Sequence, residues 1–242
     1  MFKKNTKVNI NGKNTPVLQG VGVPKKHFLC ALESAHFTNS VERLNANGKF
    51  SLTSLTIENV TMFGPNPGFV VVSAQDLKVN EKTVPNTAFN RGNSVCTITK
   101  LNCQGAEFLL FTNQARFPIA KSQYKEIPAG CGTGKNKAYE EIKEETGLDV
   151  DINSIVELGA PLYSTPGGSD EALEFSAVEI EISPEQLGKL PGSETGLATE
   201  NEFIFLSLEP LEIAVKRYLS GECIDAKEEI AMSRARNLLG WF

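Results

Sequence analysis

A helix that carries four glutamates on one side and stops at a glycine is the feature that most constrains this chain. It lies in the stretch IPAGCGTGKNKAYEEIKEETGLDV, residues 127–150. Residues 137–146 have helical composition, and Gly147 is well placed as a left-handed helix end. At about 100° per residue, the glutamates share one arc while Ala138 and Ile142 face the core from the opposite side. The four are Glu140, Glu141, Glu144 and Glu145.

Crowded carboxylates on one helix face need a counter-charge. Glu141 is three and four residues away from Glu144 and Glu145, so these carboxylates are close enough to repel one another. Mg²⁺ would relieve the repulsion, because it binds carboxylates together with substrate phosphate oxygens. A solvated acidic face balanced by Lys137 and Lys143 is the ordinary interpretation of an isolated acidic run. The Pro-Ala-Gly before the helix and the Glu-Glu-Thr-Gly-Leu at its end favour the metal site.

The glycine-rich front of the stretch offers a second hypothesis, a phosphate-binding loop. Such a loop needs a glycine, four further residues and then Gly-Lys-Ser/Thr, whose hydroxyl reaches Mg²⁺. Here Gly134-Lys135 is preceded at the required spacing by Ala129 and followed by Asn136. Both ends of the motif fail, so the carboxylates are the better candidates for the chemistry.

The composition limits the class of protein. With 242 residues, 40% of them hydrophobic and 22% charged, the chain is an ordinary globular protein that can form one large domain or two small ones. A net charge of −5 and the lack of a long basic run argue against nucleic-acid binding. No apolar run approaches the roughly 18 residues of a membrane span, and the amino terminus lacks the apolar core of a secretory signal. We therefore expect a cytoplasmic protein without a membrane partner.

The cysteines and histidines point away from disulfides and zinc. The five cysteines form no CxxC pair, and their odd number argues against a complete disulfide framework. Two histidines give poor support for a zinc site. Oxygen ligands for a hard cation remain the better expectation.

The first part of the chain predicts a small mixed module. Apolar residues recur at helical spacing over 28–44, and this run stops at Asn-Ala-Asn-Gly, residues 45–48. Short strand-like runs between 50 and 79 are broken by the turn-rich FGPNPG, which predicts a hairpin. The segment VNEKTVPN is a plausible linker. We place a β-rich amino-terminal domain at 1–90 and a second domain at 91–242.

The second part alternates strands and helices. The runs SVCTITKL and EFLLFTNQ flank NCQG and predict another hairpin. Alternating apolar and polar residues over 173–182 predict a half-buried strand, and 202–208 predicts a further strand. Helices are expected around 209–219 and 225–239. Mixed strands with helices packed outside them give an α+β sandwich.

The stretch around the acidic helix resembles the Nudix box. That motif contains a glycine, then a glutamate, then Arg-Glu-U-x-Glu-Glu-x-Gly-U, where U is a bulky aliphatic residue. Residues 141–148, EIKEETGL, fit its second half without a gap. Further segments, in chain order, are similar to those of plant-type ADP-sugar diphosphatases within the ADP-sugar pyrophosphatases. They are VTMFGPNPGF, FNRGNSV, FTNQARFPI, KEIPAG, STPGGSDE and GSETGLATENEFI.

This resemblance implies a fold and an activity. The fold would be a Nudix α/β/α sandwich preceded by a β-rich domain that helps to form a homodimer. The activity would be Mg²⁺-dependent hydrolysis of a nucleoside diphosphate sugar, such as ADP-ribose or ADP-glucose, to AMP and a sugar phosphate. Mn²⁺ could take the place of Mg²⁺.

The resemblance also implies roles for particular residues. As metal ligands it suggests Glu141 and Glu145, with the Ala129 carbonyl completing the inner shell and Glu144 in or beside it. The TENEF tract makes Glu200 the candidate base that activates water, with Glu202 as a second candidate. In the substrate site, Arg91 and Arg116 would contact the nucleotide or its phosphates, and Gly167, Gly168 and Glu171 would shape the sugar side. Arginine forks suit phosphate oxygens.

The box departs from the motif in its first half. The distance from Gly130 to Gly147 is four residues shorter than the motif requires, the first glutamate has no counterpart, and Glu140 stands at the arginine position. Lys137, one turn before Glu141, is our hypothesis for the missing positive charge. Two interpretations stay open: an active ADP-sugar hydrolase, and a catalytically weak module that binds nucleotide sugars.

Overall fold

The computed structural model describes residues 6–197 and 203–242, and its chain forms two compact units. The first unit contains the residues up to Gly92 together with Tyr163–Glu171. The second contains Asn93–Leu162 and Ala172–Phe242. Both units combine helices with β-sheet, which confirms the α+β class expected from the sequence.

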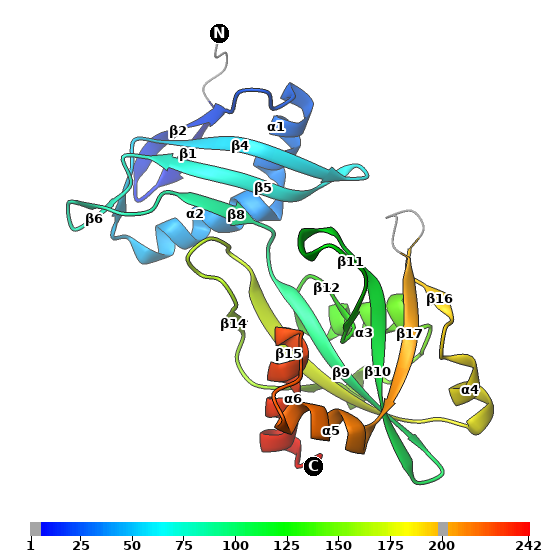
Figure 1. Ribbon diagram of the computed structural model, residues 1–242. Helices are drawn as coiled ribbons and strands as arrows, with labels where there is room; N and C mark the ends of the chain where they lie inside the picture. The colour runs from blue at the N-terminus through cyan, green and yellow to red at the C-terminus, as the bar shows by residue number, and fades with distance from the viewer. Residues whose placement is uncertain (1–5, 198–202) are drawn as a thin grey trace. The chain divides into compact units, whose positions relative to one another are not determined.

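The first unit is a curved sheet with two helices on one face (Figure 1). Its strands run in the order β1, β2, β4, β5, β8, and only the contact between β2 and β4 is parallel. A small second sheet joins β3, β6 and β7. The elements are β1 (Thr6–Ile10), β2 (Lys13–Gln19), α1 (Lys25–Glu33), α2 (Ala35–Asn47), β3 (Phe50–Ser51), β4 (Ser54–Phe63), β5 (Asn66–Gln75), β6 (Lys78–Val79), β7 (Lys82–Thr83) and β8 (Thr87–Asn90).

Local sequence explains most of this unit. The hairpin of β4 and β5 turns at the predicted Gly-Pro tract. The helical run is divided at Ser34, whose extended backbone separates α1 from α2, although one helix was predicted there. The end at Gly48 is as expected, with a left-handed backbone. The segment we expected to be a linker instead contains the hairpin of β6 and β7, because Val79 also pairs with Phe50 of β3.

The second unit is a mixed sheet with helices on both faces. The strand order is β13, β15, β9, β10, β17, β16, with β11 and β12 added beside β10 and β9. Its strands are β9 (Ser94–Cys103), β10 (Ala106–Arg116), β11 (Lys121–Glu126), β12 (Ala129–Cys131), β13 (Val156–Glu157), β15 (Ala172–Glu181), β16 (Glu194–Thr195) and β17 (Ile204–Pro210). Its helices are η1 (Phe117–Ile119), α3 (Gly134–Thr146), η2 (Ile152–Ser154), α4 (Pro184–Lys189), α5 (Leu211–Leu219) and α6 (Ala226–Leu239), and β14 (Leu162–Tyr163) lies at the boundary between the units.

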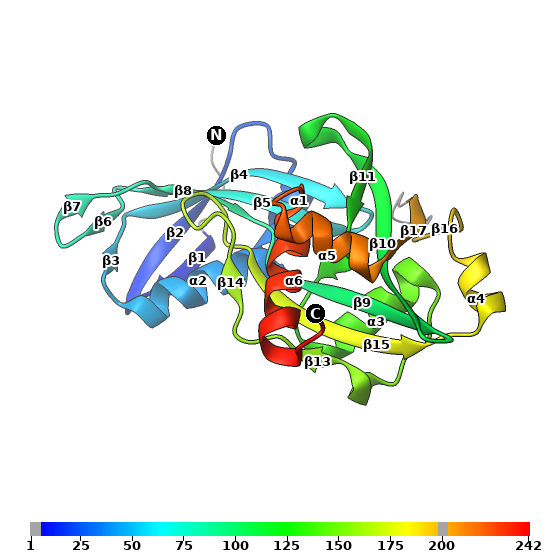
Figure 2. The same ribbon diagram turned by 60° about the horizontal axis from the view of Figure 1, so that its bottom comes forward.

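Two separate apolar clusters hold α3, α5 and α6 in place, and a third packs α4 against the sheet. Helix α3 packs Ala138 and Ile142 against one face of the sheet. On the other face, α6 covers β9 and β15, and α5 covers β10 and β17; Phe175 and Met232 are buried there (Figure 2). Strand β15 is therefore mostly buried, although its alternating sequence predicted a half-buried strand, because it lies between β9 and β13 and is covered on both faces.

The segment Tyr163–Glu171 belongs to the first unit, although the chain on both sides of it lies in the second. The nitrogen of Phe89 donates to the oxygen of Gly168 at 2.8 Å, and Ser169 forms a bridge with Phe89. This excursion carries three residues of the predicted substrate site. Among the described residues, no helix is long and apolar enough to cross a membrane.

Candidate functional site

The acidic helix α3 and strand β12 meet through Glu145. The backbone nitrogen of Ala129 donates to Glu145 Oε2 at 2.9 Å, and Glu145 is 3% exposed. Glu145 is buried because it stands at the edge of the acidic arc, next to the core-facing Ile142. The structure therefore brings two of the predicted metal ligands, Ala129 and Glu145, into direct contact.

Two glycines make room for the next acidic side chain and its partner. A Cβ atom on Gly130 would lie 1.9 Å from the Cδ of Glu141, so only glycine lets the backbone of β12 approach that carboxylate. A Cβ on Gly132 would likewise lie 2.6 Å from Cγ of Lys137. Lys137 Nζ and Glu141 Oε1 form an ion pair at 2.7 Å. The glycines thus hold Lys137 and Glu141 against the loop.

Lys137 also lies 3.5 Å from Glu140 Oε2. Although burial opposes its charge, the hydrogen bond to Glu141 and the charges of Glu141 and Glu144 raise the pKa of Lys137. An ammonium group therefore stands among these glutamates, about one helical turn before the position at which the motif has an arginine. Glu144 itself is exposed.

Residues from elsewhere in the chain fix both ends of α3. At its start, the nitrogen of Gly134 donates to Glu174 Oε2 at 2.7 Å, from strand β15. At its end, Gly147 has a left-handed backbone, as predicted, and donates to the Lys143 carbonyl. Thr195 Oγ1 donates to the Glu145 carbonyl at 2.5 Å, which ties β16 to the same end. Sequence reasoning missed Glu174, because it lies 40 residues from the glycine that it caps.

Arg116 stands in a buried ionic cluster beside this helix. Its Nη2 lies 3.0 Å from Glu126 Oε2, and Lys227 of α6 binds the same carboxylate. Glu126 is 2% exposed. Burial acts to raise the pKa of Glu126, but the hydrogen bond and charge of Arg116 and the charge of Lys227 lower it.

Burial also opposes the charge of Arg116, but the bond to Glu126 raises the pKa of its guanidinium, and the charge of Glu145 adds to this. The side chain of Arg116 is still 38% exposed. Arg116 thus stays charged beside the acidic helix and keeps part of its surface accessible.

The remaining predicted substrate residues gather in the first unit around Asp170. The nitrogens of Arg91 and Gly92 donate to Asp170 Oδ1 at 2.9 and 3.1 Å, and Arg43 forms an ion pair with its Oδ2 at 2.8 Å. Arg91 Nε lies 3.3 Å from Glu171 Oε1. Sequence reasoning missed Asp170, although its place beside Glu171 after two glycines was a usable signal.

An aromatic cluster borders Arg91 in the same unit. The rings of Phe63 and Phe69 lie 4.9 Å apart, those of Phe69 and Phe89 lie 4.8 Å apart, and the Arg91 guanidinium lies 5.7 Å from the centre of Phe69. Phe63 and Phe89 are exposed. A Cβ on Gly68 would lie 2.3 Å from the Phe63 ring, so this glycine lets the ring fold over the hairpin.

The predicted site residues therefore form two groups, each within one unit. Glu171, Arg91, Gly167 and Gly168 lie in the first unit, and a Cβ atom added to either glycine would meet no other atom within 4 Å. The second unit holds Arg116 and the predicted metal ligands, which are Ala129, Glu141, Glu144 and Glu145. The two candidate bases, Glu200 and Glu202, lie outside the described residues.

Comparison with known proteins places the chain in a family. No family model matches the sequence. Over 220 residues the chain is 30% identical to Nudix hydrolase 14, chloroplastic, of Arabidopsis thaliana, a match that covers 81% of this chain and 71% of that protein. The chain belongs to the Nudix hydrolase superfamily.

A solved structure described as an ADP compounds hydrolase resembles this Nudix protein in fold. The TM-score is 0.55 at 14% identity, and the match covers 79% of this chain and 95% of that one. The resemblance recognised in the sequence is thus confirmed at the level of the superfamily. The cytoplasmic location stays a prediction.

The donor chemistry of this Nudix box fits a hard cation. Glu141 and Glu145 place two carboxylates against the Ala129-Gly130 backbone, and Mg²⁺ in proteins commonly takes one or two carboxylates, with water and substrate phosphate oxygens completing its shell. Within residues 6–197 and 203–242, no group of three or more His, Cys, Asp or Glu side chains is arranged as a metal cluster. Because Gly130 has no Cβ, the Glu141 carboxylate can lie against the β12 backbone, on the strand whose Ala129 nitrogen binds Glu145.

Proposed function

We propose that this protein hydrolyses the diphosphate bond of an ADP-sugar, ADP-ribose or ADP-glucose, to AMP and a sugar phosphate in a Mg²⁺-dependent reaction. Membership of the Nudix superfamily supports the reaction class. The likeness to an ADP compounds hydrolase and the segments similar to ADP-sugar diphosphatases support the substrate.

The observation that carries the proposal is the arrangement of Glu145 and Glu141 around β12. Glu145 is buried and bonded to the Ala129 nitrogen, and Glu141 fills space that only a glycine leaves open. A helix face that merely met solvent would not bury one glutamate and enclose another. We infer that these carboxylates and the Ala129 carbonyl hold the cation, with Glu144 in or beside its shell.

The proposed reaction is an attack of water on a phosphorus atom of the diphosphate. The water oxygen forms a new bond to phosphorus, the bond from phosphorus to the bridging oxygen breaks, and the departing phosphate keeps that electron pair. When bound, Mg²⁺, or Mn²⁺ in its place, would neutralise phosphate charge. Glu200 would take the proton of the water, with Glu202 as the second candidate. The exposed part of Arg116 would meet a phosphate oxygen.

The first unit offers groups suited to the rest of the substrate. Arg91 has a guanidinium next to exposed phenylalanine rings, a surface on which a nucleobase could stack. Glu171 would accept hydrogen bonds from sugar hydroxyls, and Gly167 and Gly168 would leave room for the ring. Asp170 would fix the backbone of Arg91. We propose these as the substrate residues.

The alternative, a binding module without turnover, follows from Glu140 at the arginine position. The ion pair between Lys137 and Glu141 weighs against it, because it supplies a cation one turn earlier. If Lys137 replaces the arginine that orients the metal-binding glutamates, Lys137→Ala should lower turnover about tenfold or more, as is typical when a group that orients metal ligands is removed. Lys143→Ala is the matched control, because Lys143 pairs with Asp149 on the surface. An unchanged rate in Lys137→Ala would remove this role.

A substrate screen tests the proposed function directly. ADP-ribose, ADP-glucose, UDP-glucose and diadenosine polyphosphates are incubated with Mg²⁺ or Mn²⁺, and a phosphatase converts the products, but not intact substrate, to inorganic phosphate. We expect release from the ADP-sugars and its loss in Glu145→Gln. Glu185→Gln, on the exposed helix α4, is the control. Binding without release at micromolar enzyme would favour the binding module.

We also propose a homodimer formed with the help of a β-rich domain at 1–90, followed by a Nudix domain at 91–242. The proposal rests on the resemblance to the ADP-sugar pyrophosphatases. Light scattering coupled to size-exclusion chromatography measures the mass of the assembly. A mass equal to the 26.3 kDa of one chain at all protein concentrations would contradict it.

A further inference from the structure

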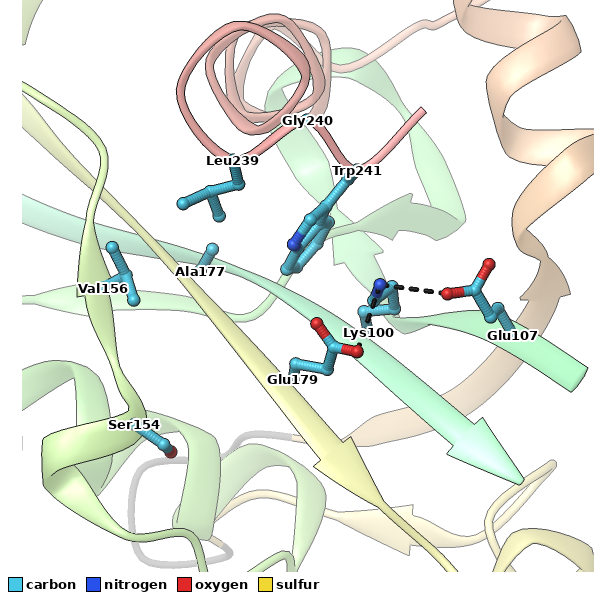
Figure 3. A pocket seen from close by; sticks show the side chains of 9 residues that line it. All are labelled: Lys100, Glu107, Ser154, Val156, Ala177, Glu179, Leu239, Gly240 and Trp241. Atoms are coloured by element: carbon cyan, nitrogen blue, oxygen red, sulfur yellow. Dashed lines mark hydrogen bonds and ion pairs between the residues drawn. The ribbon is translucent and has the colours of Figure 1, made fainter. Parts of the chain in front are cut away.

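A pocket of about 490 Å³ lies in the second unit, at the carboxyl end of helix α6 (Figure 3). Its volume falls within the range of about 300 to 1,000 Å³ typical of small-molecule sites. One side is apolar, with Val156, Ala177 and Leu239. The other side holds Lys100 between two glutamates, under the ring of Trp241.

The pocket is separate from the Nudix box. On strand β9, Val95 packs with Ala138 of α3, whereas Ile98 packs with Met232 of α6. Side chains two residues apart on a strand share a face, so Lys100 lies on the same face as Ile98. The pocket therefore opens on the face of the sheet opposite to α3.

The pocket already encloses one ammonium group. Lys100 Nζ lies 3.0 Å from Glu107 Oε1, 3.2 Å from Glu179 Oε1 and 4.9 Å from the centre of the Trp241 ring. The side chain of Lys100 is 7% exposed, whereas those of Glu107 and Glu179 are 43% and 46% exposed. Two carboxylates and the Trp241 ring thus surround the Lys100 ammonium, and because the two glutamates are the more exposed groups, the accessible charge in the pocket is negative.

We propose that this pocket binds a small organic cation, a primary amine or guanidinium on an aliphatic stem. The accessible carboxylate oxygens of Glu107 and Glu179 would accept hydrogen bonds from the cationic group. The stem would lie along Val156 and Leu239. Asn102 Nδ2 donates to Glu179 Oε1 at 2.5 Å and so holds that carboxylate in place.

The same geometry disfavours other ligands. An anion would meet two glutamates while Lys100 is engaged with both of them. A divalent metal would lie next to the Lys100 ammonium, at a cost in repulsion. The apolar side adds contact for an aliphatic stem but gives a metal ion no ligand. This inference does not depend on the proposed hydrolysis, because the site lies on the other face of the sheet.

Trp241 provides a direct readout, because it is the only tryptophan in the chain. The intact protein is titrated with cadaverine and with agmatine while tryptophan fluorescence is recorded. We expect a saturable change with a dissociation constant of about 1 mM or below. Glutarate, a dianion of similar length, and MgCl₂ at equal ionic strength should give no saturable change.

Variants locate the site. Glu179→Gln should weaken binding at least about tenfold, whereas Glu212→Gln, at an exposed position of α5 outside the pocket, should leave binding unchanged. If Glu179→Gln fails to fold, Val156→Arg serves instead, because it places a cation in the pocket and leaves the pairs of Lys100 intact. No saturable change at about 10 mM amine, an equal response to MgCl₂, or equal binding by the pocket variant would overturn the proposal.

Discussion

The substitution Gly130→Ala separates the proposed metal site from the stability of the fold. The new Cβ would lie 1.9 to 2.2 Å from the three carboxyl atoms of Glu141, so that side chain must move. A flexible glutamate can swing away, and the backbone of Gly130 lies outside the left-handed region, so alanine is conformationally acceptable. The fold should survive while the carboxylate leaves its place.

The expected magnitudes differ for stability and for metal binding. Alanine in a compatible conformation stabilises by about 0.4 to 1 kcal/mol through the unfolded chain. Loss of the partly exposed pair between Lys137 and Glu141 would cost about 0.2 to 1 kcal/mol. These contributions nearly cancel, so the free energy of unfolding should change by less than about 1 kcal/mol. A displaced ligand should weaken metal binding at least about tenfold, or about 1.4 kcal/mol.

Metal affinity is measured by titrating Mn²⁺ while electron paramagnetic resonance monitors the free ion, and stability is measured by thermal or denaturant unfolding. Gly188→Ala in helix α4 is the matched control, because its new Cβ would have free space. In a Glu141→Ala background, Gly130→Ala should have no further effect on the metal, because the carboxylate it displaces is absent. Wild-type Mn²⁺ affinity in Gly130→Ala, or simple additivity of the two substitutions, would refute the reasoning.

Three further predictions concern stability and reactivity. Glu126→Gln should destabilise the fold by about 2 kcal/mol, less than the roughly 3 to 5 kcal/mol of a fully buried pair, because Arg116 keeps 38% exposure. Since Arg116 and Lys227 lower the pKa of Glu126, the stability contributed by the Glu126 carboxylate is complete above about pH 4.5 and is lost as pH falls further. Below that pH, wild-type stability should therefore fall more steeply than the stability of Glu126→Gln. Glu174→Ala should cost about 0.5 to 2 kcal/mol in denaturant unfolding by removing the cap of α3, and no loss would contradict the capping role. Burial and the nearby Glu228 raise the pKa of Cys223 to about 12, so iodoacetamide at pH 8 should label it far more slowly than the exposed Cys131 in peptide mass spectra; equal rates would count against this.

The elements with strong local signals were predictable. Helix α3 and its end at Gly147, the hairpin of β9 and β10 and the two final helices all match the sequence reasoning. The break at Ser34 and the hairpin of β6 and β7 were not foreseen. The strands of that hairpin are only two residues long, which gives no alternating pattern, and β6 also pairs with the more distant β3.

The candidate site, like the fold, was predictable from the sequence only in part. The sequence by itself determined an acidic helix with a glycine end, the superfamily, and the residue types suited to a hard cation, because helix periodicity and motif spacing act over a few neighbouring residues. Only the tertiary structure decided that Glu145 is buried, that glycines enclose Glu141 and Lys137, and that Glu174 caps α3. The role of a carboxylate depends on the groups that surround it, and folding brings those groups from distant parts of the chain.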